Sequence, residues 1–311
     1  MKWRKIGRIF NPVEYSLNYA QSPQVVVFEN FIRIYFSTRT SDLSGKFLSK
    51  VAFIDMKKDM TEIIKLSKDE VIPLGNRGCF DEHGIFPINP LKVDGEIWAF
   101  TSGWSRRVSV SVNTGIGLAK SSDGGETFEK IGSGPILTAN LNEPFLVADP
   151  FVRKINDQYH MWYIFGTEWK KYRDEEEPDR IYKIAHAVSN DGMNWVRDGI
   201  PIIIDVLEDE SQALPTVLIN SHGYHLFFCF RKSYDFRVNS ENSYRMGYAF
   251  SKDGLTWTRN DEVGRIDPSK DDWDSEMICY PHIFEVDNKV YMLYNGNEFG
   301  KYGFGLAELE Q

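Results

Sequence analysis

The 311-residue sequence is poor in cysteine and has no long hydrophobic segment. Its three cysteines, Cys79, Cys229 and Cys279, lie far apart without metal-ligand spacing, which favours free thiols in a reducing compartment over a disulfide framework. No run approaches the ~20 apolar residues that span a bilayer, and the first residues lack the apolar core of a signal peptide. These absences predict a cytoplasmic protein without a membrane partner.

Positive charge is also scarce, because 36 Lys and Arg face 45 Asp and Glu, a formal charge of −9. Nucleic-acid affinity comes largely from Lys and Arg that neutralise phosphates, so this balance disfavours a nucleic-acid partner. No P-loop, dinucleotide glycine fingerprint or H-E-x-x-H segment occurs, and no pattern requires a metal or another cofactor. Aromatic residues, in contrast, make up 14% of the chain. The oligomeric state is left open.

A five-fold internal repeat organises the chain. Three Asp-Gly turns share one pattern, and segments that contain an alanine recur five times; the turns lie at 121–130, 189–199 and 251–260, and the alanines are Ala52, Ala119, Ala187, Ala249 and Ala307. Asp-Gly between alternating apolar segments is typical of a β-hairpin. Prolines that enter an apolar segment recur at intervals of 60 to 67 residues, at Pro23, Pro90, Pro150, Pro215 and Pro281.

This repeat predicts an all-β fold, a five-bladed β-propeller of four-stranded antiparallel blades that forms a single domain over residues 1–311. The fifth unit ends after three strands, whereas the chain begins with Trp3-Arg4-Lys5. That tripeptide resembles the fourth-strand segments at 128–130, 195–197 and 257–259. We therefore expect the N-terminal strand to complete the last blade and close the ring.

The predicted loops divide between two faces of the propeller. The segment 121–128 matches the Asp-box pattern S-x-D-x-G-x-T-[WF], and we expect Asp123, Asp191 and Asp253 to stabilise turns on one face. Carboxylates, aromatics, amides and arginines gather on the other face. Sugar rings stack on aromatic side chains and their hydroxyls bind polar groups, so this second face predicts a site for a small carbohydrate.

The whole chain resembles the five-bladed β-propeller glycosidases, which include the arabinanase and β-xylosidase, the invertase and levansucrase, and the mannoside-phosphorylase groups. The resemblance lies in Ala148-Asp149-Pro150, FDEHG (80–84), WDSEMICYP (273–281) and YNGN (294–297). It implies a carbohydrate-active enzyme, first of all a glycoside hydrolase that acts on a small glycoside. A glycosyltransferase, a glycoside phosphorylase and a non-catalytic sugar-binding propeller are the alternatives.

By the same resemblance, Asp149 matches the aspartate that tunes the catalytic acid and holds the sugar. Two other carboxylates of the family are absent, since the corresponding segments read AQSP (20–23) and SQALP (211–215). Arabinanase-type inverting hydrolysis is therefore disfavoured. We predict a catalytic trio of Asp81, Asp149 and Glu276, with Glu276 as acid and Asp81 as base or nucleophile, whose carboxylates lie within about 10 Å of one another.

Ten further residues of this face are predicted to bind the substrate. They are His83, Trp104, Glu143, Trp169, Arg231, Asp274, Tyr280, His282, Asn295 and Asn297. Arg231 ends an apolar strand and is a candidate to bind a phosphate, a sugar carboxylate or a neighbouring carboxylate. The charged stretch 170–180 is expected to be a solvated loop, with a lid over the site as the alternative.

Overall fold

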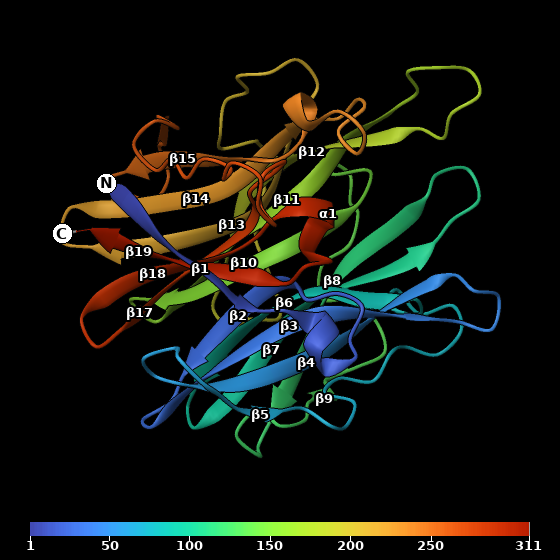
Figure 1. Ribbon diagram of the computed structural model, residues 1–311. Coiled ribbons are helices and arrows are strands. Elements are labelled where there is room, and N and C mark those ends of the chain that lie inside the picture. Colours follow the sequence, from blue (N-terminus) through green and yellow to red (C-terminus); the bar gives the residue numbers. More distant parts are fainter. Residues whose placement is uncertain (311) are drawn as a thin grey trace.

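The computed structural model describes residues 1–310, which form five consecutive antiparallel meanders (Figure 1). The first contains β2 (Gln21–Val27), β3 (Phe31–Ser41), β4 (Phe47–Lys57) and β5 (Ile63–Leu66), and the second β6 (Gly84–Val93), β7 (Glu96–Arg106), β8 (Val112–Ser121) and β9 (Glu129–Lys130). The third contains β10 (Val147–Ile155), β11 (Gln158–Lys170) and β12 (Asp179–Ser189), and the fourth β13 (Glu210–Asn220), β14 (Gly223–Lys232), β15 (Arg245–Ser251) and β16 (Thr258–Arg259). The fifth contains β17 (Cys279–Val286), β18 (Lys289–Asn295), β19 (Phe304–Glu310) and β1 (Lys2–Phe10).

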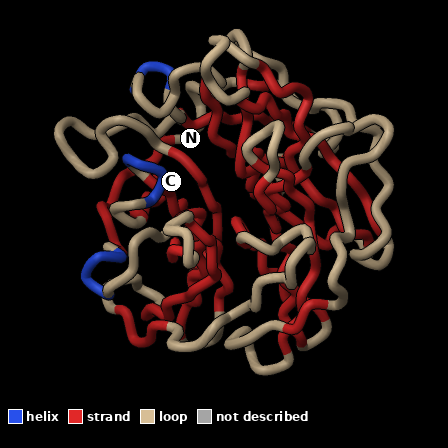
Figure 2. Tube along the Cα trace, turned by 90° about the vertical axis from the view of Figure 1, so that its right-hand side faces the viewer, coloured by secondary structure: helices blue, strands red, loops and turns tan. Residues whose placement is uncertain are grey.

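Helices are few and short. They are η1 (Pro12–Tyr15), η2 (Ser240–Asn242) and α1 (Asn297–Gly300). Figure 2 shows these helices as short separate pieces, while strands make up most of the interior. The prediction of an all-β chain built from four-stranded antiparallel sheets is confirmed for four of the meanders; in the third, one bridge between Val188 and Val196 replaces the fourth strand.

The first and last strands of the chain lie side by side, because β1 pairs antiparallel with β19 (Figure 1). β1 thereby becomes the fourth strand of the fifth meander, as the sequence predicted. Trp3 of β1 is buried, and its ring meets Phe227 edge to face at 5.6 Å between ring centroids. This apolar contact joins the closing strand to the fourth meander.

The first strands of the meanders contact one another in the cyclic order β2, β6, β10, β13, β17 and again β2. Side chains tie these neighbours together: the Val152 N–H donates to Asn89 Oδ1 at 2.8 Å, and the Val25 N–H donates to His282 Nε2 at 3.1 Å. Burial, with the charge of Arg153, lowers the pKa of His282 to about 3. His282 is therefore a neutral acceptor that holds β2 against β17.

A β-bulge interrupts each first strand at a proline. The bulges contain Ser22-Pro23, Phe86-Pro87, Asp149-Pro150, Leu214-Pro215 and Tyr280-Pro281. The prediction that Pro90 marks the second unit is wrong, because Pro90 pairs regularly with Ala99 and Pro87 takes the equivalent place. Bulges bend a strand and re-aim its side chains. Asp149 and Tyr280, with φ of 54° and 56°, are turned in this way.

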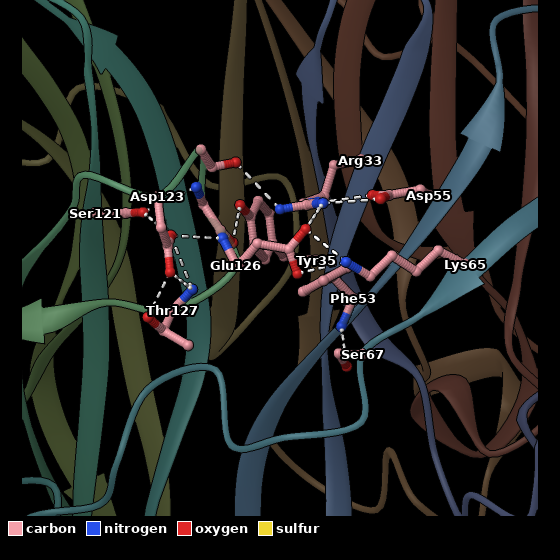
Figure 3. Close-up of polar contacts among 12 residues, drawn as sticks. Arg33, Tyr35, Phe53, Asp55, Lys65, Ser67, Ser121, Asp123, Glu126 and Thr127 are labelled. Carbon is pink, nitrogen blue, oxygen red and sulfur yellow. Dashed lines mark hydrogen bonds and ion pairs between the residues drawn. The ribbon is translucent and has the colours of Figure 1, made fainter.

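The Asp-Gly turns are structural, as the sequence predicted. Asp123 accepts the backbone N–H groups of Glu126 and Thr127 and the hydroxyl of Ser121 (Figure 3). Asp191 and Asp253 likewise accept two backbone N–H groups each within their own turns. A carboxylate used in this way satisfies turn amides and is not available to a substrate.

The first of these turns also binds the neighbouring meander (Figure 3). The buried Arg33 of β3 pairs with Asp55 at 2.6 Å and with Glu126 of the turn at 2.8 Å, and it donates to the Gly124 carbonyl at 3.1 Å. Lys65 of β5 pairs with Glu126 at 2.6 Å. This network fixes the first meander to the second, far from the carbohydrate site predicted on the other face.

Candidate functional site in the central cavity

A cavity of about 330 Å³ lies where the five bulged strands converge, a volume typical of small-molecule sites. We call it the central cavity. Its lining comprises Gln21, Arg39, Phe47, Ser49, Phe86, Trp104, Val112, Thr114, Leu146, Ala148, Asp149, Ile164, Arg180, Tyr182, Ala213, Leu214, Arg231, Phe236, Arg237, Tyr244, Tyr280 and Phe299. All five meanders contribute, and four of the residues that precede a bulge proline, namely Phe86, Asp149, Leu214 and Tyr280, lie in this lining.

Asp149 is the one carboxylate among the described lining residues. Its backbone N–H donates to Ser102 Oγ at 2.7 Å, and its Oδ2 accepts the Leu214 N–H at 3.1 Å. Burial raises the pKa of Asp149 to about 7, although the Leu214 N–H and the charge of Arg180 act to lower it. A carboxyl group with such a pKa exchanges a proton near neutral pH, which suits it to acid–base chemistry.

Four arginines share the cavity lining with Asp149: Arg39, Arg180, Arg231 and Arg237. Arg39 donates to Gln21 Oε1 at 2.9 Å, and Arg237 makes a long contact of 3.4 Å with Asp179. The described lining is therefore cationic, although the whole chain is acidic.

Aromatic side chains form much of the remaining wall. Tyr182 of β12 and Tyr244, just before β15, bind each other through their hydroxyls at 2.7 Å. Tyr280 meets Tyr244 edge to face at 5.6 Å. Trp104 of β7 stacks on His83 at 5.9 Å between ring centroids. Such walls offer π-faces to the C–H faces of a sugar ring.

The structure does not bring the predicted catalytic trio together in the cavity. Asp149 lines it, whereas Asp81 and Glu276 are absent from its described lining. Asp81 is fully buried and pairs with Lys130 of β9 at 2.7 Å. Glu276 is exposed in the loop before β17, where its backbone N–H donates to Asn297 Oδ1 at 2.7 Å. A catalytic role for Asp81 or Glu276 therefore has no geometric basis in the cavity.

Asp81 belongs to a repeated structural ion pair. In four meanders, an acidic residue before or at the start of the first strand pairs with a basic residue of the outermost segment: Asp81 with Lys130, Glu143 with Arg197, Glu210 with Arg259, and Asp274 with Lys5. The acidic side chains are 0–1% exposed. Tyr163 and Tyr294 also donate hydrogen bonds to Glu143 and Asp274. The prediction that Glu143 and Asp274 bind substrate is thus replaced by a structural role.

The other predicted binding residues divide in the same way. Trp104, Arg231 and Tyr280 line the cavity, so their role in substrate binding stays a prediction. Asn295 is buried and binds the Ser22 N–H and two backbone carbonyls, so it supports β2 and has no group left for a substrate.

Three further predicted residues also lie outside the described lining of the cavity. Asn297 binds the loop that carries Glu276. Trp169 packs against the core of the third and fourth meanders. His83 stacks behind Trp104 and accepts the Arg106 N–H at 3.4 Å, so it orients a wall residue.

Several cavity residues were not identified from the sequence. Arg180 lies in the charged stretch 170–180, for which the sequence predicted a solvated loop or a lid over the site, and no residue of this stretch was predicted to bind the substrate. Tyr182 and Tyr244 begin the repeated third-strand segments YKIAHA and YRMGYA, so their shared place in the repeat was an available signal. Phe236 and Arg237 follow β14 in a loop without a repeat pattern.

Within residues 1–310, no group of three or more His, Cys, Asp or Glu side chains is arranged to hold a metal ion. None of the helices in the same range has the length and apolar character needed to cross a membrane.

Solved structures of carbohydrate-active enzymes share this fold. A glycoside hydrolase has a TM-score of 0.75 at 17% identity, with 99% of this chain and 91% of that chain covered. A thermostable family-43 glycoside hydrolase has a TM-score of 0.65 at 14% identity, covering 94% and 90%. A structure from the GH130 family of mannoside phosphorylases, which contains glycoside hydrolases that target β-1,2-mannosidic linkages, has 0.66 at 14%, covering 94% and 84%.

Sequence relatives extend over the full chain. No family model matches the sequence. An uncharacterized protein of Mycobacterium tuberculosis is 31% identical over 315 residues in each of two strains, CDC 1551 / Oshkosh and ATCC 25618 / H37Rv, and 100% of both chains is covered. The chain therefore belongs to the family of this mycobacterial protein, and its fold is that of the five-bladed propeller glycoside hydrolases and phosphorylases.

Proposed function

We propose that this protein is a carbohydrate-active enzyme that cleaves or transfers a glycosidic bond in the central cavity of a five-bladed propeller, with hydrolysis of a small glycoside as the first reaction to test. One observation carries the proposal: a buried carboxyl group with a pKa of about 7, Asp149, lies in a cavity of about 330 Å³ with aromatic walls. The shared fold is consistent with this reaction class.

Asp149 acts in this proposal as the proton donor to the glycosidic oxygen. Departure of the leaving group needs that proton, and a donor with a pKa near the working pH is effective. Burial keeps part of the Asp149 population protonated at pH 7. Tyr182, Tyr244 and Trp104 would hold the sugar rings beside it.

Transfer to an acceptor other than water is the second candidate reaction. Hydrolytic glycosidases use two carboxyl groups, one as acid and the other as base or nucleophile. The described lining of the cavity contains Asp149 and no second carboxylate. A phosphate or another nucleophilic acceptor needs less activation than water, so one acid group serves phosphorolysis or glycosyl transfer.

A panel of aryl glycosides tests the proposal and separates these reactions. We expect release of the phenol from at least one glycoside, measured with and without phosphate or a sugar acceptor. Where a sugar nucleotide is the donor, the nucleotide is the leaving group, and its release is measured instead. Release in buffer alone identifies hydrolysis, whereas release that requires phosphate or an acceptor identifies transfer. Saturable sugar binding without turnover under any of these conditions would leave only the sugar-binding alternative.

The pH dependence gives a further prediction. Asp149 donates a proton, so kcat/KM is expected to be constant below pH about 7 and to fall about tenfold per unit above it. Arg180, Cys229 and Tyr280 are the ionisable groups whose charges couple to Asp149, and only Arg180 is charged near neutral pH. Steady-state rates measured on both sides of pH 7 test this fall in kcat/KM. A kcat/KM that rises through pH 7 would make Asp149 a base instead.

We also propose a cytoplasmic location. Cys229 and Cys279 are buried free thiols, and Cys79 is free as well within the described chain. Free thiols are typical of a reducing compartment.

A further inference from the structure

The side chains that line the central cavity include more positive than negative groups. Arg39, Arg180, Arg231 and Arg237 line it, and Asp149 is the one carboxylate beside them in the described lining. Because burial raises the pKa of Asp149 to about 7, this group is only partly ionised at neutral pH. Asp179, outside the lining, lies 3.4 Å from Arg237, so the four arginines less Asp149 and Asp179 leave a surplus of at least two positive charges in a chain with a formal charge of −9.

Arg231 has the most unusual environment of the four. Its side chain is among the largest fully buried ones, with the residue 1% exposed. One terminal nitrogen donates to the Tyr182 hydroxyl at 3.1 Å and the other to the Lys232 carbonyl at 2.9 Å. Its Nε has no hydrogen-bond partner among the described residues. A buried guanidinium is normally paired with an anion, and here aromatic faces take that place, Phe236 at 3.5 Å.

Arg180 and Arg237 increase the same positive field. The charges of Arg231 and Arg180 act, after desolvation, to lower the pKa of Arg237, whereas the charge of Asp179 acts to raise it. The Arg237 side chain is 57% exposed, so it lies at the solvent side of this group. The Arg180 carbonyl accepts the hydroxyls of Ser211 and Ser233, so the backbone fixes this residue on β12. The Arg180 side chain makes no hydrogen bond or ion pair with the described residues, which leaves it available to a ligand.

We propose that the sugar bound in the central cavity carries an anionic group, a phosphate or a carboxylate, and that Arg231, Arg180 and Arg237 bind this group. The proposal rests on the proposed function only in that it takes the ligand to be a carbohydrate. Guanidinium groups bind both oxyanions through paired N–H donors, and the bond is strongest where water is excluded.

The position of the arginines relative to Asp149 fits one ligand that reaches both. Arg180 is close enough for its charge to act on the pKa of Asp149, and its charge also acts on the pKa of Arg237. A sugar ring between the tyrosine wall and Trp104 would thus place its glycosidic oxygen near Asp149 and its anionic substituent among the arginines. The volume of about 330 Å³ holds about eleven water molecules, enough for a monosaccharide with such a substituent.

Matched ligands provide the test. Binding to the full chain is measured by calorimetry for glucose, mannose and galactose, for their uronates and 6-phosphates, and for inorganic phosphate. We expect at least one uronate or sugar phosphate to bind at least about tenfold more tightly than its neutral parent and than phosphate alone. A preference for the phosphate or for the carboxylate series identifies the anion. No preference over the neutral parents, or equal binding of inorganic phosphate alone, overturns the proposal.

Charge-removing variants show whether the preference arises in the cavity. R180Q and R231Q are each expected to weaken the anionic sugar at least about tenfold and the neutral parent little. R265Q is the matched control, because Arg265 is outside the described cavity lining, exposed, and paired with Glu262 and Asp267. Thermal unfolding shows whether each variant is folded. If R231Q does not fold, the anion preference of R180Q alone tests whether the arginines of the cavity bind the anionic group. An unchanged preference in R180Q overturns the assignment.

The proposal of an anionic ligand and the proposal of an enzymatic reaction can fail independently in these experiments. An anion preference without turnover on any glycoside supports the site and removes the enzymatic proposal. Turnover of neutral aryl glycosides without any anion preference supports the enzymatic proposal and removes the proposed anion site.

Discussion

Replacement of Asp149 by asparagine is expected to lower kcat by about 10²–10⁴-fold, the usual contribution of a general acid. The amide cannot donate the proton that the leaving oxygen requires. Its side-chain oxygen can still accept the Leu214 N–H, which Asp149 Oδ2 now binds at 3.1 Å, so the bulge at Pro150 is preserved. The rate loss should therefore occur in a folded protein, as seen from an unfolding transition at pH 7 that is no lower than that of the wild type, because the neutral amide avoids the cost of a buried charge.

Glu276→Gln is the matched control for this loss. Glu276 is exposed outside the described cavity lining, and its change also converts a carboxylate into an amide of the same shape. We expect its kcat to stay within about twofold of the wild type, since surface changes of this kind have small effects. If Glu276→Gln lost the activity and D149N kept it, the acid would be Glu276, as the sequence pattern first indicated.

The effect of Asp149 on stability provides an independent check of its environment. The pKa of Asp149 is raised from 3.8 to about 7 in the folded chain, so the folded state binds the proton more tightly than the unfolded state. Stability from this group is complete below pH about 4 and is lost as the pH rises through about 7. D149N should remove this part of the pH dependence, measured by urea unfolding between pH 5 and 8.

The repeat carried most of the information about the fold. The Asp-Gly turns of three units and the alanines of all five depend on local backbone geometry, and they recur because the units make the same hairpins. The closing role of Trp3-Arg4-Lys5 was predictable for the same reason. The position of the second bulge could not be predicted, because GIFPINP contains both Pro87 and Pro90. Only the strand pairing of Pro90 with Ala99 distinguishes the two prolines.

The site was harder to predict because side-chain partners lie in distant segments. Asp81 and Lys130 are 49 residues apart, and Asp274 pairs with Lys5 across almost the whole chain. The sequence showed both halves of this pattern, acidic residues before first strands and basic residues in fourth strands, but not that they neutralise each other. The carboxylates expected at the mouth of the site are mostly consumed in this way, which leaves a cationic cavity.

Glu210→Ala is expected to lower the free energy of unfolding by about 3–5 kcal/mol, the usual cost of breaking a buried ion pair. Both partners are almost fully buried: the side chain of Glu210 is 0% exposed and that of Arg259 2%, and they meet at 2.6 Å. Glu210 also accepts the Val206 and Leu207 N–H groups. Urea unfolding measures the loss; Glu241→Ala, at an exposed glutamate, should change stability by less than about 0.5 kcal/mol.

The double replacement Glu210→Leu with Arg259→Met distinguishes a structural pair from a catalytic one. Glu210→Ala leaves the buried Arg259 with Asp261 as its ion-pair partner at 3.0 Å, whereas the double variant removes both charges of the buried pair. The double variant should therefore be more stable than Glu210→Ala even though it lacks the same carboxylate. Because neither residue is in the described lining of the central cavity, the folded double variant should keep its kcat. Recovered stability with lost turnover would contradict this, and it would show that the acidic residues before the first strands act in the reaction after all.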